Sequence, residues 1–272
     1  MEHRKIAFIG AGNMARSIIA GLVASEYPAE AIIATGPNQD KIDVLHQQYG
    51  VNVTTDNLVA VQQADVVVLA VKPQLMEQVI SELKAVDVSN KLVISIAAGI
   101  AVERLEQMFE SKLNIVRVMP NTPSLVSRGM SGLYAKPQLA EVDKQFASQL
   151  MQAVGETCWV EQESGINNII AAAGSAPAYF FLFMEAIQQE AIRSGFDKQT
   201  ARLLVQQTAL GAAEMVVANP DIELDTLRSQ VTSKGGTTAE AIRTFEESDI
   251  RGIVARSMQA AVNRAQEMEK LF

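Results

Sequence analysis

The chain has 272 residues, 48% of them hydrophobic, and a formal net charge of −8, so it can bury a substantial core in one large domain or two. Its basic residues are scattered along an acidic chain, which argues against binding to a nucleic-acid backbone. The single cysteine, Cys158, excludes an intramolecular disulfide and a cysteine-based zinc site, which suits a reducing compartment.

The chain begins with a nucleotide-binding pattern. The apolar strand Lys5–Ile9 runs into Gly10-Ala11-Gly12-Asn13-Met14-Ala15, and a helix follows. This is the G-x-G-x-x-G/A fingerprint in its expected place between a strand and a helix. Gly10 permits the tight turn, Gly12 lets a pyrophosphate approach the backbone, and Ala15 lets the helix pack closely on the strand. The pattern predicts a dinucleotide site.

The second predicted strand, Ala31–Thr35, bears on the choice of dinucleotide. An NAD site usually has an acidic residue at the end of this strand, where it bonds the ribose 2′-hydroxyl. Here Thr35-Gly36-Pro37-Asn38 follows, with no carboxylate before Asp40. Thr35 and Asn38 could donate hydrogen bonds to a 2′-phosphate, so NADPH is favoured, although NADH stays possible because the nearest cation is Lys41 and no arginine is present.

Three more strands end in turns that should share one edge of a parallel sheet. Continuous apolar runs of this kind are typical of strands buried on both faces. Ligands bind at the carboxyl edge in open α/β sheets. Residues 1–163 are therefore predicted to form a Rossmann-type, doubly wound cofactor domain. The strands and the turns after them are Ala64–Val71 with Lys72-Pro73, Lys91–Ala97 with Ala97-Ala98-Gly99, and Asn114–Met119 with Pro120-Asn121-Thr122-Pro123.

Residues 164–272 carry no strand pattern and are predicted to form an all-helical domain. The segment Tyr179–Met184 is apolar around the whole helix, which favours pairing with a second subunit over burial inside one protomer. The apolar segment Ile169–Met184 is interrupted and shorter than the ~20 residues of a membrane span, so a soluble, cytoplasmic protein is expected. The predicted helices are Ile166–Ser194 with a break at Gly174–Pro177, Lys198–Ala218, Leu224–Ser229, Thr237–Glu247 and Asp249–Lys270.

The stretch Val231–Glu240 combines two glycines with four hydroxyl side chains directly before a helix. Adjacent glycines let a ligand approach the backbone, and the first N–H groups of a helix suit a carboxylate or phosphate. Thr237 and Glu240 also fit a capping box. A capped helix after a simple Gly-Gly turn is the alternative.

Taken together, these stretches resemble pyrroline-5-carboxylate reductases over essentially the whole chain. The most specific part is Val231-Thr232-Ser233-Lys234-Gly235-Gly236-Thr237-Thr238, which is similar to the family signature V-T-S-P-G-G-T-T. The other motifs that support the resemblance are Gly10-Ala11-Gly12-Asn13-Met14-Ala15, Ala70-Val71-Lys72-Pro73, Ala97-Ala98-Gly99, Val118-Met119-Pro120-Asn121-Thr122-Pro123 and Gly174-Ser175-Ala176-Pro177-Ala178-Tyr179.

The resemblance implies an oxidoreductase of proline biosynthesis that reduces L-1-pyrroline-5-carboxylate to L-proline with NAD(P)H. It also implies subunits that pair through their helical domains, often with the dimers assembled into a decamer, and no metal. Thr238 is predicted to be the catalytic hydroxyl that bonds the ring nitrogen of the substrate. The implied substrate contacts are Glu163, Thr232, Ser233, Gly236, Thr237 and Thr238. The implied cofactor contacts are Gly10, Gly12, Asn13, Met14, Thr35, Asn57, Ala70, Val71, Lys72, Ala97 and Ala98.

The chain departs from the family pattern at a few positions. Lys234 replaces the signature proline, and Ala173 and Ala176 replace a serine and a glycine of S-G-S-G-P-A-Y. The arginine that follows the second strand in many NADP-preferring members is absent. Two alternatives stay open: a reductase of the same layout that acts on another small imine or hydroxyacid, and a non-catalytic NADP-binding protein.

Overall fold

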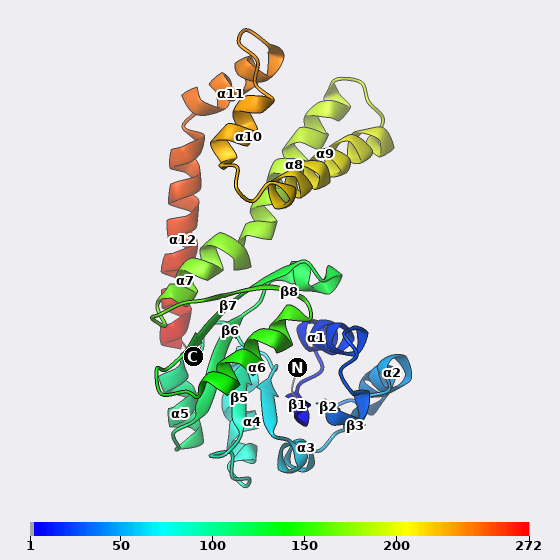
Figure 1. Ribbon diagram of the computed structural model, residues 1–272, viewed down its shortest axis with the longest axis vertical. Helices are drawn as coiled ribbons and strands as arrows, with labels where there is room; N and C mark the ends of the chain where they lie inside the picture. The colour runs from blue at the N-terminus through cyan, green and yellow to red at the C-terminus, as the bar shows by residue number, and fades with distance from the viewer. Residues whose placement is uncertain (1–2, 272) are drawn as a thin grey trace. The chain divides into compact units, whose positions relative to one another are not determined.

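The computed structural model describes residues 3–271, which pack into two compact units. One unit contains the chain up to Ser175 together with its last segment from Ala261, and the other is Ala176–Ala260. The predicted division into domains 1–163 and 164–272 stays a prediction. Figure 1 follows the chain from its first strand to its last helix by colour.

The first unit is built on one eight-stranded sheet in the order β3-β2-β1-β4-β5-β6-β7-β8. Every neighbouring pair is parallel except β6 and β7, which are antiparallel. The predicted Rossmann-type sheet followed by helices is therefore confirmed. The strands are β1 (Ile6–Ile9), β2 (Ile32–Thr35), β3 (Asn52–Thr54), β4 (Val66–Leu69), β5 (Leu92–Ser95), β6 (Asn114–Met119), β7 (Gly129–Ala135) and β8 (Gly155–Trp159).

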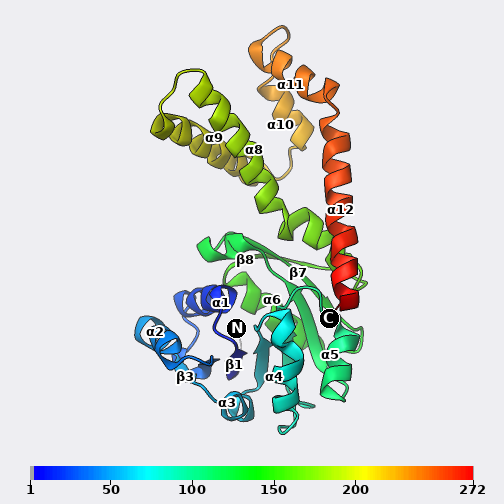
Figure 2. The same cartoon turned by 180° about the vertical axis from the view of Figure 1, so that it is seen from behind.

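Helices cover both faces of this sheet, and the alternation along β1 shows why. Ile6 and Phe8 belong to one buried apolar cluster, and Ala7 and Ile9 belong to another on the opposite face. Figure 1 shows the face covered by α1 and α6, and Figure 2 the face covered by α4 and α5. The helices of this unit are α1 (Asn13–Ala24), α2 (Gln39–Tyr49), α3 (Asn57–Gln63), α4 (Met76–Leu83), α5 (Val102–Phe109), α6 (Glu141–Gln152) and α7 (Gly165–Ile169).

Strands β7 and β8 were not predicted from the sequence. Strand β7 contains two glycines and a serine among its seven residues, so it shows neither an apolar run nor an alternating pattern. At the start of β8, a Cβ added to Gly155 would lie 2.0 Å from the carbonyl oxygen of Gly129. The two strands therefore approach through glycine backbones, a contact that leaves no hydrophobic signal in the sequence.

The second unit is helical and exposes apolar side chains. In α8 the exposed fractions of Phe180, Phe181 and Leu182 are 68%, 64% and 67%. The alternative that this segment is buried inside one protomer is therefore wrong. The helices from Ala176 onward are α8 (Ala176–Arg193), α9 (Lys198–Ala218), α10 (Leu224–Gln230), α11 (Thr237–Glu247) and α12 (Ile250–Leu271), the last of which returns to the first unit.

The predicted break before α8 is a π-helical turn, η4 (Ile170–Gly174). It is closed by a bond of 2.7 Å from the Ser175 N–H to the Ile170 carbonyl. Because the helical path continues through the turn, Gly165–Arg193 is 29 residues long and by length and composition alone could cross a membrane. The expectation that this segment is too short for a span is wrong. Core helices of soluble proteins pass the same test, so one such helix is weak evidence for a membrane.

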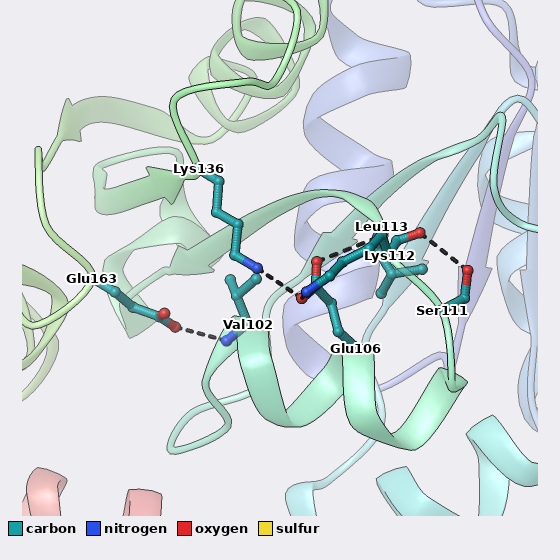
Figure 3. Close-up of polar contacts among 7 residues, drawn as sticks. All are labelled: Val102, Glu106, Ser111, Lys112, Leu113, Lys136 and Glu163. Carbon is teal, nitrogen blue, oxygen red and sulfur yellow. Dashed lines mark hydrogen bonds and ion pairs between the residues drawn. The ribbon is translucent and has the colours of Figure 1, made fainter.

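A buried carboxylate joins α5 to the strand that follows it. Glu106 is 6% exposed and accepts hydrogen bonds from Lys136 Nζ at 2.7 Å, Lys112 Nζ at 3.0 Å and the Leu113 N–H at 3.4 Å (Figure 3). Burial raises the pKa of Glu106, but these three donors outweigh burial and hold the pKa below its usual range.

We expect Glu106→Gln to lower the free energy of unfolding by about 1–3 kcal/mol at pH 7, because charged hydrogen bonds to a buried group are lost. The lowered pKa means that the carboxylate stabilises the fold above its unfolded pKa of about 4.3, and that this contribution disappears as the pH falls through the folded pKa. Urea unfolding at pH 7 and at about pH 3, below the lowered pKa, measures both values. Glu103→Gln, which removes an exposed charge from the same helix, is the control. An equal loss of stability at both pH values would contradict the prediction.

Candidate active site

Four predicted ligand-binding turns lie at one edge of the sheet. They follow β1, β4, β5 and β6, which are consecutive parallel neighbours in the sheet. The chain order reverses at β1, which pairs with β2 on one side and β4 on the other. Such a switch point at the carboxyl edge of an open α/β sheet is where ligands bind.

The two fingerprint glycines have different surroundings. Gly10 adopts φ +100°, and an added Cβ would lie 2.9 Å from Val71 Cγ1 and 3.0 Å from the carbonyl oxygen of Ala70. Gly12 is exposed, and no atom lies within 4 Å of the position that its Cβ would take. Gly10 is thus required by the protein's own packing, whereas the space beside Gly12 is open to a ligand.

The start of α1 can receive an anion. Gly12 is the residue before the helix, and no side chain caps the first N–H groups of α1. The first turn has no acidic residue, so the helix dipole there is unopposed. Asn13 and Met14 form this turn, and they are exposed and half-buried, respectively. These features fit a pyrophosphate, which needs backbone donors and close approach.

Thr35 supports the glycine turn from beneath. It is 0% exposed, and its Oγ1 accepts from the Gly10 N–H at 3.3 Å and donates to Asn57 Oδ1 at 2.6 Å. In this arrangement the hydroxyl hydrogen is directed to Asn57 within the chain, and the expectation that Thr35 donates to a ribose phosphate stays a prediction. Asn38, the other predicted donor, is exposed and caps α2 by accepting from the Lys41 N–H at 3.1 Å.

The turns after β4 and β5 form the neighbouring part of this edge. Ala70 and Val71 are half-buried, and Lys72 is exposed at the start of the short turn Pro73–Leu75. Ala97 is 6% exposed and Ala98 is half-buried. These small residues leave space beside the backbone, as a flat ring would need.

Glu163, predicted to bind substrate, accepts hydrogen bonds from two groups of this chain. Its Oε1 accepts from the Val102 N–H at 2.7 Å and from Arg117 Nη1 at 2.9 Å. Arg117, on β6, is 1% exposed and also donates from Nη2 to Glu269 at 2.8 Å. The prediction from sequence missed Arg117, although an arginine inside an otherwise apolar strand was the available signal.

Asn121, in the predicted turn after β6, is a further buried polar residue that fixes this edge. It is 8% exposed, donates from Nδ2 to the Ala173 carbonyl at 3.1 Å, and accepts at Oδ1 from the Met130 N–H at 2.9 Å. It therefore joins the turn after β6 to the π-helical turn η4 and to β7.

The predicted substrate residues other than Glu163 lie in the second unit. Thr232 donates to the Arg228 carbonyl at 2.6 Å, and the Gly236 N–H bonds the Ser233 carbonyl at 3.0 Å, which closes the turn. Helix α11 starts at Thr237 after Gly236, and no side chain caps it. The predicted capping box of Thr237 and Glu240 is wrong, because Thr237 lies inside the helix and Glu240 pairs with Arg243.

The uncapped start of α11 leaves its first N–H groups without intrahelical acceptors. Thr237 and Thr238 are exposed there. Three further features mark a small-ligand turn: the backbone of Gly236 is extended, its neighbour Gly235 adopts φ +72°, and hydroxyls flank both glycines. In the described part of the chain, no group of three or more His, Cys, Asp or Glu side chains could hold a metal ion.

A doubly wound sheet with an open glycine turn at its switch point, followed by helices, defines a two-domain dinucleotide-dependent oxidoreductase. The family model for NADP oxidoreductase, coenzyme F420-dependent, matches residues 5–99, and the model for pyrroline-5-carboxylate reductase dimerisation matches residues 163–268. A pyrroline-5-carboxylate reductase of Vibrio alginolyticus is 66% identical over 272 residues, which is 100% of both chains. The chain belongs to the pyrroline-5-carboxylate reductase family, which confirms the resemblance seen in the motifs.

Solved structures agree with this assignment. A pyrroline-5-carboxylate reductase from Coxiella burnetii superposes with a TM-score of 0.94 at 43% identity and covers 98% of this chain and 99% of its own. A pyrroline carboxylate reductase of Plasmodium falciparum with NADP bound has a TM-score of 0.85 at 28% identity, with 99% of each chain covered. The NADP oxidoreductase model and this NADP-bound relative together support the use of NAD(P)H.

The contrast between Gly10 and Gly12 gives a test of the cofactor site. We expect Gly12→Ala to change the free energy of unfolding by less than about 0.5 kcal/mol, because its Cβ meets nothing. It should still weaken NADPH binding at least about tenfold, since the methyl group occupies the approach of the pyrophosphate.

Gly10→Ala serves as the matched comparison, with an expected loss of about 1–3 kcal/mol from the positive φ and the close contacts. Thermal unfolding without nucleotide and titration of NADPH fluorescence measure the two effects. Unchanged NADPH affinity in Gly12→Ala would place the pyrophosphate elsewhere.

Proposed function

We propose that this protein reduces the C=N bond of L-1-pyrroline-5-carboxylate to give L-proline. The observation that supports this most strongly is the relationship to pyrroline-5-carboxylate reductases over the full chain, at 66% identity to one of them. When bound, NAD(P)H supplies the hydride that adds to the carbon of the C=N bond. One proton on the ring nitrogen completes the reduction to a secondary amine.

The turn before α11 is suited to hold the carboxylate of such a substrate. The N–H groups of Thr237 and Thr238, at the start of the helix, are free of side-chain caps, and the dipole of the 11-residue helix favours an anion at this end. Ser233 and Thr232 flank the glycines, and Ser233 Oγ lies 2.5 Å from the position that a Cβ on Gly236 would take. A side chain at position 236 would therefore displace the Ser233 hydroxyl, one of the predicted substrate contacts.

Thr238 is proposed to act on the ring nitrogen. Its hydroxyl is exposed in the first turn of α11, so it can donate to, or accept from, a ring held by its carboxylate at the same helix end. An iminium accepts hydride more readily than a neutral imine, so a substrate that binds already protonated needs only orientation. Holding the two reactants face to face contributes up to ~7–11 kcal/mol, which makes positioning the larger part of this mechanism.

We propose NADPH as the preferred reductant. No carboxylate follows β2 before Asp40, so nothing at the strand end repels a 2′-phosphate. The start of α2 adds its N–H groups and Lys41, whereas Asp40 in the same turn opposes them. The proposed cofactor contacts are Gly10, Gly12, Asn13, Met14, Ala70, Val71, Lys72, Ala97 and Ala98, with Thr35 and Asn57 supporting the turn.

The apolar surface of the helical unit supports assembly. The family dimerisation model spans residues 163–268, which include the exposed side chains of α8. Leu203, Leu204 and Leu210 on α9 are also exposed, at 57%, 46% and 52%. We propose that they are buried between two copies of the chain, that the dimers assemble further into a decamer, and that the enzyme works in the cytoplasm.

The first test is the rate of NADPH oxidation with pyrroline-5-carboxylate, with NADH measured in parallel. We expect Thr238→Ala to lower kcat by about 10²-fold, because the hydroxyl that orients the ring nitrogen is lost. Thr244→Ala, which changes another exposed threonine of α11, is the control. No turnover with either nucleotide would exclude this substrate and favour another small imine.

The second test concerns assembly. We expect Phe181→Asp to raise the dimer dissociation constant at least about tenfold, because a buried charge in an apolar contact is costly. Phe181→Leu keeps an apolar side chain and serves as the control. Light scattering after gel filtration gives the mass, and circular dichroism confirms that the helices persist. A dimer of unchanged stability in Phe181→Asp would move the interface away from α8.

A further inference from the structure

We propose that Glu163 is a positioning residue of the cofactor site, which holds the loop between β5 and α5 in place, and is not a substrate contact. The proposal rests on the proposed function only in taking this loop, residues 96–101, as part of the dinucleotide site. Arg117 and Glu269 complete the arrangement by fixing the carboxylate of Glu163 from behind. All these residues belong to the first compact unit.

Glu163 caps a helix that has no cap of its own. The residue before α5 is Ala101, whose side chain cannot accept a hydrogen bond. Glu163 Oε1, 61 positions further along the chain, accepts from the first N–H of that helix, on Val102, at 2.7 Å. Figure 3 shows the Glu163 carboxylate reaching the Val102 nitrogen at the start of α5. The negative charge at this helix end also complements the dipole.

The loop that ends at this cap is the one with the predicted cofactor contacts. It leaves β5, contains Ala97 and Ala98, turns at Gly99 with φ +76°, and enters α5 at Val102. Gly99 and the two alanines provide no side-chain hydrogen bonds that could fix the loop. Ile96 and Ile100 hold the loop by apolar packing, and the cap on Val102 adds a hydrogen bond that fixes its end.

Arg117 sets the direction of the Glu163 carboxylate. Val116 and Val118 on β6 face one apolar cluster and Ile115 faces the other, so the alternation places Arg117 on the face of the sheet that α5 covers. Its guanidinium forks between two carboxylates, with Nη1 to Glu163 at 2.9 Å and Nη2 to Glu269 at 2.8 Å. A lysine ammonium is a single point charge and cannot reproduce this fork.

Glu269 is held in turn from the other side. Its second oxygen accepts from Asn167 Nδ2 at 3.1 Å, and Arg117 occupies the first. Arg117 is 1% exposed, so its charge is neutralised by these partners and not by water. Both donors to Glu163 and both donors to Glu269 come from this chain. Glu163 Oε1, the oxygen that caps α5, is therefore committed to two donors within the chain.

The experiment measures NADPH binding and substrate kinetics separately. We expect Glu163→Ala to raise the dissociation constant of NADPH about tenfold, with the KM for pyrroline-5-carboxylate at saturating NADPH changed less than about twofold. Glu163→Gln should recover part of the affinity, because the amide oxygen can still accept from Val102. Glu161→Ala removes an exposed carboxylate two residues earlier and is the control, with NADPH affinity unchanged.

A second pair of variants tests the donor of this hydrogen bond, the Val102 N–H, in place of its acceptor, Glu163. Proline is tolerated as the first residue of a helix and has no N–H, and Ala101 already has the extended conformation that precedes proline. Val102→Pro should therefore weaken NADPH binding as Glu163→Ala does. Val102→Ala keeps the N–H and serves as the reference for lost packing.

Fluorescence titration of NADPH needs no turnover, so it can be read even if pyrroline-5-carboxylate is not the substrate. Weakened NADPH binding in both Glu163→Ala and Val102→Pro, with Arg117→Lys also weakened, supports the proposal. Unchanged NADPH affinity in Glu163→Ala, together with a KM for pyrroline-5-carboxylate raised about tenfold, would overturn it and make Glu163 a substrate contact.

Discussion

The burial of a parallel sheet on both faces is the constraint on which the rest of this structure depends. Parallel strands need crossover helices, and those helices cover the two faces, so only the strand ends remain open to ligands. Because these four strands are parallel neighbours, the turns after β1, β4, β5 and β6 meet at one edge of the sheet. The chemistry at that edge is then set by what each turn contains, which here is glycine, alanine and few charged side chains.

The same constraint explains why the supporting polar groups lie beneath the edge and not on it. Thr35 bonds the glycine turn while it is fully buried, and Arg117 is buried on β6 between two carboxylates. An unpaired buried polar group is costly, and because Thr35 and Arg117 are both hydrogen-bonded, each also fixes the segments that it contacts. A few buried polar groups of this kind fix the conformation of the turns at the edge of an otherwise apolar sheet.

The sequence predicted those features whose cause is local. The fingerprint at Gly10 and Gly12 and the apolar strands could be found because each depends on neighbouring residues. Strands β7 and β8 could not, since their contact through Gly129 and Gly155 depends on backbone approach and has no hydrophobic pattern. The capping box failed by one residue, because Gly236 and not Thr237 precedes α11.

The polar contacts of the site were the least predictable part, because their partners are distant in the chain. Arg117 lies 46 residues from Glu163 and 152 from Glu269, and no local pattern relates three such positions. The family motif predicts Glu163 as a substrate contact, and that role stays a prediction beside the positioning role proposed above. A residue at the edge of a site either contacts the ligand or holds the segment that does, and its own hydrogen bonds distinguish the two. With two donors on one carboxylate oxygen, Glu163 has the contacts of a residue that holds the segment.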